Sequence, residues 1–486
     1  VVIPRHAGDV AETIRLAAEH RLPVLPRGSG TSLGGQTVGE AIVLDFSKYM
    51  NRILELNVAE RWGRVQPGVV LDQLNDWLKP HGLHFAPDVS TSNRASIGGM
   101  TGNNSSGAHS LLYGKTIDHV QALQVVLSDG SEAAFRELSE SEWRAKEASA
   151  GLEGQIYREV ARLAAEHRDE ILARVPKLLR RVGGYNLDRF LPPEDQQQFE
   201  AGRMYRDTDW RNLAKIVVGS EGTLCAVTEI TVNLVPNPKH KALCVVHFHD
   251  LIEALEAVPL MLACKPAAIE LTDRYILDLT RGNLALAARR AFLDGDPAAI
   301  QVVEFYGESL DEVRAHLEHL KQALRHAGYG YSYVDAITAE EQARVWDVRK
   351  AGLGLLMGLK GDVKPIGFVE DTAVPPEHLA AYIRRFRQLL ADRGVEASYY
   401  AHSSVGCLHV RPMLNLKDRR DVEKMHDIAV AVSDLVAEYG GAMSAEHGDG
   451  LVRSEFIAKM YGPQLYAAFQ AVKRAFDPHG IMNPGK

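Results

Sequence analysis

Two segments of the chain carry side chains of the types that bind metal ions. The segment YYAHSSVGCLHVRP contains His402 and His409, and the segment MSAEHGDG contains Glu446 and His447. Two imidazoles at neighbouring strand ends can converge on one ion, and a carboxylate completes three ligands with one position left for substrate. With 19 histidines in the chain, such spacing also arises by chance, so the spacing alone favours a metal site only weakly.

The elements that must position these histidines are two short strands. Ala397–His402 and Cys407–Arg411 both have strand character, and the Ser-Val-Gly between them allows a hairpin. Side chains two residues apart on a strand share a face, so His409 and Arg411 point the same way. We therefore expect an arginine beside the candidate ion, where it can grip a carboxylate with two hydrogen bonds.

A second candidate cation lies in the segment EEQARVWDVRKAG. Arg349 follows Trp346 by three residues, which places both on one face of the expected helix. The pattern alone favours a solvated surface arginine. Lys364, in the segment GDVKPIGFVEDTAVP, is a weaker candidate for the same role.

Three glycine-rich segments separate the regular elements of the first half: PRGSGTSLGG from Pro26, SIGGMTGNNSSGAHSLLYG from Ser96 and GSEGTLCAVTEI from Gly219. Glycines allow close approach of the backbone to a ligand, and successive N–H groups can converge on an anion. None of the segments has the GxGxxG fingerprint of a dinucleotide fold followed by a helix, or the lysine of a phosphate-binding P-loop. We expect the first two segments to be loops and the third to be a strand, a turn and a strand.

Composition excludes several classes of protein. The chain has 486 residues, 46% of them hydrophobic, which is enough for two to four domains with large cores. The formal net charge of −8 argues against a nucleic-acid partner and against a polybasic membrane surface. Four cysteines without a CxxC pair fit a reducing cytoplasm rather than a disulfide scaffold. We expect no membrane span, because no run of 18 apolar residues occurs.

The order of the expected elements indicates an α+β fold. Short strands alternate with helical segments over the first 130 residues, a charge-rich helical insertion runs from about 132 to 211, and strand character returns at Lys215–Val218 and Cys225–Val235. After the two prolines of VPNPKHK, the pattern favours an antiparallel sheet with helices on one face. The last 60 residues are mostly helical.

Taken together, the glycine segments, VVGSEGTL and the terminal FDPHGIMNPGK resemble the vanillyl-alcohol-oxidase type of FAD-binding flavoprotein. Within that type, the chain is similar to the FAD-linked D-2-hydroxyacid dehydrogenases, which act on D-lactate, glycolate or D-2-hydroxyglutarate. The resemblance implies a two-part FAD-binding domain over residues 1–235, a cap domain with the substrate site over 236–425, and a C-terminal segment over 426–486 that returns to the FAD domain.

The resemblance also implies the cofactor site. Its residues would be Pro26, Arg27, Gly28, Ser29, Gly30, Thr31, Ser32, Pro87, Ser96, Gly98, Gly99, Thr101, Asn103, Ser105, Gly107, Gly222, Val227 and Asn483. Some relatives attach FAD covalently to a histidine of the first loop. Thr31 stands at that position here, so we expect non-covalent FAD.

By the same resemblance, His402, His409 and Glu446 are metal ligands and His447 is the catalytic base, with Zn²⁺ as the favoured ion and Mn²⁺ and Fe²⁺ as alternatives. Arg349, Lys364 and Arg411 would bind substrate. The sequence departs from the family pattern at several positions: Ser404, Val405 and Cys407 replace Gly, Asp and Asn, and Arg411 stands where many relatives have Asn.

The implied reaction is oxidation of a D-2-hydroxy acid, with D-2-hydroxyglutarate favoured because several cations suit a second carboxylate. The variant GCLHVRP resembles the long branch of the family in which an iron–sulfur domain follows the FAD part. The electron acceptor is then a quinone, an electron-transfer flavoprotein or such a domain, and a membrane-bound acceptor would place a cytoplasmic protein at the inner membrane face. Three alternatives stay open: a non-redox FAD transferase of the alkyl-dihydroxyacetone-phosphate synthase type, a metal-only hydrolase, and an oxidase that uses O₂.

Overall fold

The computed structural model describes residues 1–199 and 210–486, and residues 200–209 of the expected helical insertion lie outside this part. The chain divides into two compact units. Unit 1 comprises residues 1–107, 113–237 and 446–486, and unit 2 comprises residues 108–112 and 238–445. Unit 2 ends at residue 445 and not at the expected boundary of 425, because helix α18 (Arg419–Glu438) packs against α17 (Leu379–Ala391) inside unit 2.

Unit 1 is built on an antiparallel sheet in the order β3-β4-β8-β6-β7. Its strands are β3 (Ile53–Asn57), β4 (Trp62–Val65), β6 (Val120–Val126), β7 (Glu132–Phe135) and β8 (Ala226–Asn233). Two small sheets accompany it: a parallel pair, β1 (Val24–Arg27) with β2 (Ile42–Asp45), and an antiparallel pair, β5 (Leu83–His84) with β9 (Val235–Pro236).

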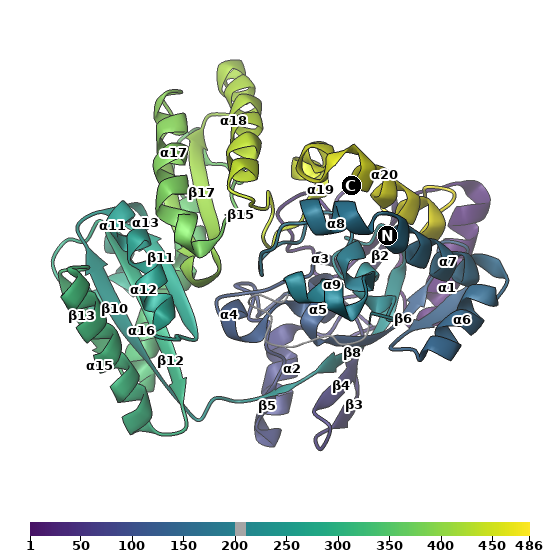
Figure 1. Cartoon of the computed structure of the whole chain (residues 1–486), viewed down its shortest axis with the longest axis horizontal. Coiled ribbons are helices and arrows are strands. Elements are labelled where there is room, and N and C mark those ends of the chain that lie inside the picture. Colours follow the sequence, from purple (N-terminus) through teal and green to yellow (C-terminus); the bar gives the residue numbers. More distant parts are fainter. Residues whose placement is uncertain (200–209) are drawn as a thin grey trace. The chain divides into compact units, whose positions relative to one another are not determined.

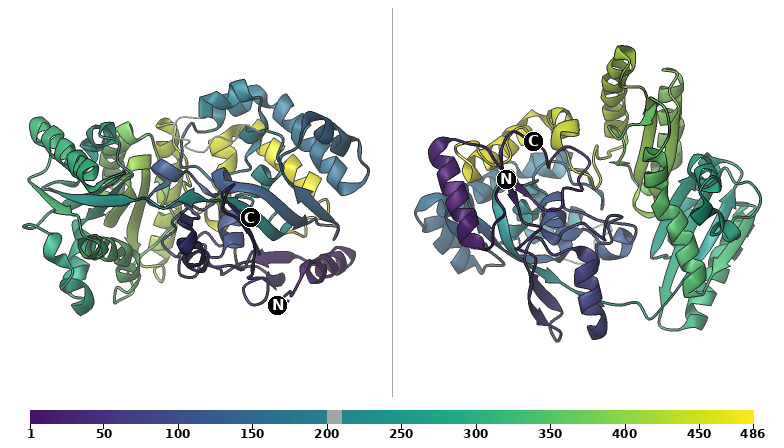
Figure 2. Two further views of the ribbon diagram at one scale, coloured as in Figure 1. Left: turned by 90° about the horizontal axis from the view of Figure 1, so that it is seen from below. Right: turned by 180° about the vertical axis from the view of Figure 1, so that it is seen from behind.

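Helices from distant parts of the sequence cover the sheet of unit 1. The C-terminal helix α20 (Ile457–Phe476) packs against α7 (Gly151–Glu166) and α8 (Arg168–Arg174), as the yellow and blue ribbons of Figures 1 and 2 show. Aromatic side chains such as Tyr157 and Phe476 meet in this core. The charged insertion is thus part of the main core of unit 1. The other helices of unit 1 are α1 (Ala7–His20), α2 (Leu71–Leu78), α3 (Ile97–Asn103), α5 (Thr116–His119), α6 (Glu140–Ala148), α9 (Pro193–Gln196), α10 (Ala214–Val217) and α19 (Gly450–Arg453).

Two segments differ from their expected structures. The glycine-rich segment from Ser96 was expected to be a loop, yet Ile97–Asn103 forms helix α3, which Ser96 caps because its hydroxyl accepts a hydrogen bond from Gly99 N–H. Lys215–Val218 was expected to be a strand, yet Ala214–Val217 forms helix α10, whose first N–H donates to the Asn212 side chain. The segment from Gly219 to Ile230 is consequently a turn followed by strand β8.

Unit 2 is built on an eight-stranded antiparallel sheet in the order β13-β10-β12-β11-β16-β17-β14, with β15 paired to β17. The strands are β10 (His240–Phe248), β11 (Ala268–Asp273), β12 (Ala299–Gly307), β13 (Ser332–Ala336), β14 (Lys364–Pro365), β15 (Thr372–Ala373), β16 (Ala397–His402) and β17 (Cys407–Leu414). The antiparallel sheet expected for the cap is present.

Helices cover both faces of this sheet, whereas the sequence pattern favoured one face. On β12, the odd-numbered Phe305 stacks on His316 of α15 (Leu310–Ala327), while the even-numbered Val302 packs with Val345 of α16 (Ala339–Met357). Adjacent positions on a strand point to opposite faces, so α15 and α16 lie on opposite sides. The remaining helices of unit 2 are α11 (Leu251–Glu256), α12 (Val258–Ala263), α13 (Arg274–Arg281) and α14 (Leu284–Ala287). Helix α4 (Ser110–Tyr113) lies where the chain passes between the units.

All four cysteines are buried, and none of them forms a disulfide. Within the described ranges, none of the helices combines the length and the apolar character that crossing a membrane requires.

Candidate functional site

The expected hairpin of β16 and β17 is present and brings two histidines together. The register pairs Tyr400 with His409 and His402 with Cys407. The His409 ring stacks on Tyr400 at a centroid distance of 4.5 Å, and the His402 ring meets His409 edge to face at 5.2 Å. Both imidazoles thus lie at one end of the hairpin within unit 2.

Arg411 extends the same face of β17 and is buried. Its Nη2 donates to the Glu370 carboxylate at 2.7 Å, and its Nε donates to the Tyr400 hydroxyl at 3.2 Å. Burial raises the pKa of the Tyr400 phenol well above its usual range, so this hydroxyl stays protonated. Nη1 has a weaker acceptor, the sulfur of Met357 at 3.9 Å. One edge of the guanidinium is therefore fixed, and the other meets a weakly polar side chain.

Arg349 of α16 also contacts Tyr400. Its guanidinium lies 5.2 Å from the centre of the Tyr400 ring, and its Nη2 donates to Glu270 at 2.7 Å. Its Nε is buried and has no hydrogen-bond partner among the residues that the structure describes. Arg349 is thus not the solvated surface arginine that its sequence pattern alone favoured. Lys364, by contrast, donates to the backbone carbonyl of Leu359.

Asp371 joins the hairpin to the chain that leads into unit 1. Its backbone N–H donates to the carbonyl of Leu408 at 2.7 Å, next to His409. Its carboxylate accepts from the Ser444 hydroxyl at 2.8 Å, and its carbonyl accepts from the N–H of Ala445 at 2.8 Å. Glu446 is the next residue along the chain.

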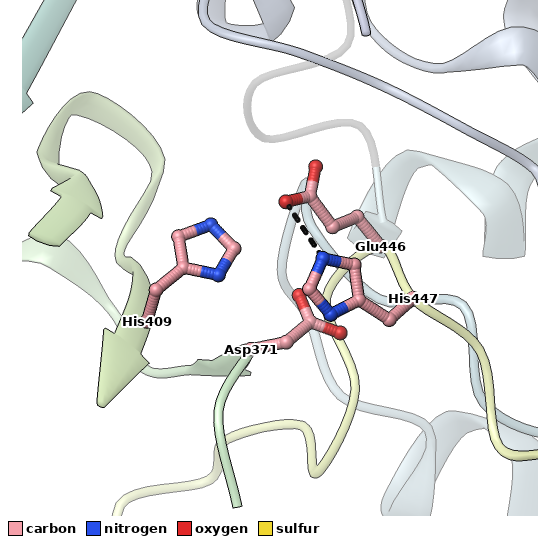
Figure 3. A group of neighbouring side chains, drawn as sticks. All are labelled: Asp371, His409, Glu446 and His447. Atoms are coloured by element: carbon pink, nitrogen blue, oxygen red, sulfur yellow. Dashed lines mark ion pairs between the residues drawn. The ribbon is translucent and has the colours of Figure 1, made fainter. Parts of the chain in front are cut away.

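Glu446 and His447 are held by residues of unit 1. Their backbone carbonyls accept hydrogen bonds of 2.6 Å from the side-chain amides of Asn103 and Gln36, respectively. The His447 Nε2 lies 3.5 Å from the Glu446 carboxylate, as the dashed line in Figure 3 marks. The guanidinium of Arg180, which is fully buried, pairs with the same carboxylate. A backbone fixed by two amides presents both side chains in a defined direction.

Side chains of metal-binding types occur in both units. Figure 3 shows Asp371 and His409 of unit 2 and Glu446 and His447 of unit 1, which are all of metal-binding types. Asp371 was not among the expected ligands. His402 was expected, and its Nδ1 lies 2.7 Å from the Glu270 carboxylate. A carboxylate only accepts hydrogen bonds, so Nδ1 carries the proton and Nε2 is the ring nitrogen for a metal.

Unit 1 contains a cavity that encloses about 670 Å³ of space, part of it open to solvent. Half of its lining was singled out from the sequence: Pro26, Arg27, Gly28, Ser32, Gly98, Gly99, Asn103, Gly222 and Val227. The other lining residues are Gln36, Thr37, Phe46, Pro67, Gly102, Val217, Ser220, Glu221 and Cys225. The first loop, helix α3 and the turn before β8 thus meet at one cavity.

The remaining residues of the expected cofactor site do not line this cavity: Ser29, Gly30, Thr31, Pro87, Ser96, Thr101, Ser105, Gly107 and Asn483. Several of them shape its walls. Ser96 caps α3, and the Asn483 amide donates to the carbonyls of Gln36 at 3.0 Å and Glu221 at 2.7 Å. Asn483 of the C-terminal segment therefore links two lining residues of the cavity, Gln36 and Glu221, through hydrogen bonds.

Glycine is required at two of the lining positions. A Cβ on Gly98 would lie 2.9 Å from the backbone of Pro67, which is too close for any side chain. Gly222 has a φ of 71°, in the left-handed region that favours glycine. Beside it, burial and the neighbouring Asp449 raise the pKa of Glu221 to about 8. The cavity wall thus combines glycine backbone with a carboxyl group that has a reduced tendency to ionise.

Residues of unit 2 that sequence reasoning missed are Glu270, Glu370, Asp371 and Tyr400. Their signal in the sequence is weak. Glu270 lies among apolar residues in the segment AAIELTD, whose other carboxylate, Asp273, ends the strand, and Asp371 follows Glu370 in a segment rich in turns. A buried carboxylate needs a partner, but only the folded sheet shows which arginine or histidine provides it.

The described geometry agrees with comparisons to known proteins. Residues 1–135 match the FAD binding domain, and residues 237–486, more than half of the chain, match the C-terminal domain of FAD linked oxidases. The chain belongs to the FAD-linked oxidase family. This membership confirms the resemblance that the glycine-rich segments indicated, and it argues against a metal-only hydrolase with purely structural glycine loops.

Curated relatives of the family cover the whole chain. A D-2-hydroxyglutarate dehydrogenase of Pseudomonas putida is 40% identical over 496 residues, which is 100% of this chain and 48% of that protein. The chain thus spans about half the length of this relative. The glycolate oxidase subunit GlcD of Bacillus subtilis is 27% identical, over 100% of this chain and 88% of that protein.

Among solved structures, p-cresol methylhydroxylase with bound substrate superimposes with a TM-score of 0.67 at 14% identity, over 100% of this chain and 87% of that one. At this identity the likeness concerns the fold alone. It confirms the vanillyl-alcohol-oxidase type of FAD fold, combined here with an antiparallel sheet and helices in unit 2.

Proposed function

We propose that this chain is the catalytic part of an FAD-dependent dehydrogenase that oxidises a D-2-hydroxy acid to the 2-oxo acid. The observation that carries the proposal is the cluster in unit 2, where His409, Arg349 and the buried Arg411 contact Tyr400 and the His402 ring meets His409 edge to face. Imidazoles that can hold a cation, beside guanidinium groups that can hold a carboxylate, match the two ends of a 2-hydroxy acid. The relatives named for D-2-hydroxyglutarate support this substrate, and D-lactate and glycolate are alternatives.

The cavity of unit 1 fits the phosphates and ribityl chain of FAD, because glycine backbone and small polar side chains line it. We propose that FAD binds there without a covalent bond, since Thr31 replaces the histidine to which some relatives attach FAD. The proposed metal ligands are His402, His409 and Glu446, to which we add Asp371, because its backbone N–H is hydrogen-bonded to Leu408 next to His409. Imidazoles and carboxylates suit Zn²⁺, which is the favoured ion.

When bound, FAD accepts a hydride equivalent and the metal ion lowers the pKa of the substrate hydroxyl. The chain's own residues perform the other tasks. His447 accepts the hydroxyl proton, and the amide of Gln36 fixes its backbone at 2.6 Å. Arg349 grips the carboxylate next to the reacting carbon through its buried Nε, which has no hydrogen-bond partner among the described residues and so provides a donor. Lys364, bonded to Leu359, has a lesser role in substrate binding.

Arg411 is proposed to bind the second carboxylate of a diacid through its Nη1 edge. Replacing it alone would leave Glu370 buried without its cation, so two variants are needed: Arg411→Lys, and Arg411→Met combined with Glu370→Gln. We expect kcat/KM for D-2-hydroxyglutarate to fall roughly tenfold or more beyond the fall for D-lactate, as is usual for a lost charge-assisted contact. Steady-state turnover with an artificial dye acceptor measures both.

In this comparison D-lactate is the internal control, because it lacks the second carboxylate. An equal fall in kcat/KM for both acids would mean that Arg411 does not bind the second carboxylate. Turnover of neither acid by the FAD-loaded, metal-loaded chain would count against the proposed function itself.

The proposal extends to partners and location. Electrons leave to a quinone, an electron-transfer flavoprotein or an iron–sulfur domain, and the protein works in the cytoplasm or at the inner membrane face. The negative net charge supports the expectation that no nucleic acid takes part.

A further inference from the structure

Glu270 lies between two residues that the proposed function uses for different purposes. It is 1% exposed and sits on β11, directly opposite His402 of β16 in the sheet register. One carboxylate oxygen lies 2.7 Å from the His402 Nδ1, and the other accepts from the Arg349 Nη2 at 2.7 Å. A single buried carboxylate is therefore shared by a proposed metal ligand and a proposed substrate contact.

The contact to His402 has a defined consequence. Because the carboxylate accepts the Nδ1 proton, it fixes the tautomer in which Nε2 has a lone pair for a metal, and it also fixes the plane of the ring. Outer carboxylates of this kind are the usual partners of metal-binding histidines.

The contact to Arg349 has a second consequence. The carboxylate neutralises the guanidinium in a buried place and holds it through Nη2, while the buried Nε has no hydrogen-bond partner within the described residues. Arg349 is thus held at the proposed substrate site, and its Nε–H can donate a hydrogen bond to the substrate carboxylate. A buried charge pair is costly to bury and is weak evidence for stability alone, which leaves room for a role in function.

We propose that Glu270 is a positioning residue that couples the metal site to the substrate-carboxylate site by orienting His402 and Arg349 together. The inference rests on the proposed function, because it takes His402 as a metal ligand and Arg349 as the substrate contact. It predicts that a change at Arg349, which has no metal-binding group, alters metal affinity through Glu270.

The test is a measurement of Zn²⁺ affinity, by competition with a chromophoric chelator, on the metal-free, FAD-loaded chain without substrate. Glu270→Gln keeps the size of the side chain but has one acceptor oxygen, so it can serve His402 or Arg349 and not both. We expect the Kd for Zn²⁺ to rise roughly 10–100-fold, the usual effect of losing an outer carboxylate. Arg349→Met is expected to raise it by a factor of about 5 or more, the lower end of typical coupling between sites.

Glu304→Gln is the matched control. Glu304 is also fully buried, on the neighbouring strand β12, and it pairs with a histidine, His109. It contacts neither His402 nor Arg349, so its Kd for Zn²⁺ should stay within about twofold of the wild-type value, the usual range for uncoupled sites. Thermal unfolding of all variants separates a loss of fold from a loss of affinity, and Glu270→Asp, which is too short to reach both partners, replaces the glutamine variant if that variant does not fold.

A wild-type Kd for Zn²⁺ in a folded Glu270 variant would overturn the inference and leave the proposed function intact. A wild-type Kd in Arg349→Met, with a weakened Glu270 variant, would overturn the coupling. If the wild-type chain itself binds no Zn²⁺, the metal part of the proposed function fails and the inference fails with it.

Discussion

Removal of the metal with EDTA is expected to abolish turnover of the D-2-hydroxy acid while FAD stays bound. The proposed ligands lie on the β16–β17 hairpin, at Asp371 and at Glu446, whereas the cavity of unit 1 is lined by the first loop, α3 and the turn before β8. Loss of the ion should therefore leave the flavin absorbance unchanged. Dye reduction, flavin absorbance and elemental metal content are measured on the same sample before and after chelation.

Addition of Zn²⁺ to the chelated sample is the control, and turnover should return. If a sample shown to be free of metal kept full activity, the metal ion would have no role in the reaction. Loss of FAD together with the metal would mean that the two sites depend on each other, contrary to their placement on different segments.

Replacing His447 with asparagine is expected to lower kcat by roughly 10²–10⁴, the usual range for the loss of a general base. Asparagine keeps a polar side chain of similar size but cannot accept the proton. The backbone carbonyl of residue 447 should still accept the bond from Gln36, so the segment keeps its position. Stopped-flow measurement of flavin reduction reports the chemical step directly.

His326→Asn, at an exposed position in the last turn of α15, is the matched control and should leave the rate unchanged. The metal content of the His447 variant must also be measured, because His447 lies next to the proposed ligand Glu446. A loss of less than tenfold in a metal-loaded variant would place the base elsewhere.

Local patterns predicted the parts of the site that lie close together in the sequence. The hairpin around His402 and His409 follows from two short apolar runs around a glycine, and the side-chain period of two placed His409 and Arg411 on one face. The glycine segments indicated one cofactor site, and the first loop, α3 and the turn before β8 meet at one cavity.

Partners that come from distant strands were not predictable in the same way. No sequence motif marks Glu270 or Glu370, and their roles appear only when the sheet pairs β11 with β16 and Arg411 lies next to Glu370. The helix at Ser96–Asn103 was missed because its glycines favour a loop locally, and the close packing of Gly98 on Pro67 and the Ser96 cap outweigh that preference.

The covered faces of the sheet in unit 2 had a signal in the sequence that the expectation of one covered face did not use. The apolar runs of β10 and β12 are nearly continuous, which is typical of strands buried on both faces. Their near-continuous burial in the structure corresponds to α15 on one side and α16 on the other.

The central claim, that bound flavin takes electrons from a D-2-hydroxy acid, is tested most directly by anaerobic titration of the purified, metal-loaded chain. The flavin absorbance is followed while D-2-hydroxyglutarate, D-malate, D-lactate or glycolate is added, with the L-isomers as controls. We predict that D-2-hydroxyglutarate bleaches the flavin and that its L-isomer does not. No bleaching by any of these acids, in a yellow sample that contains both FAD and metal, would contradict the account and favour a non-redox use of the flavin.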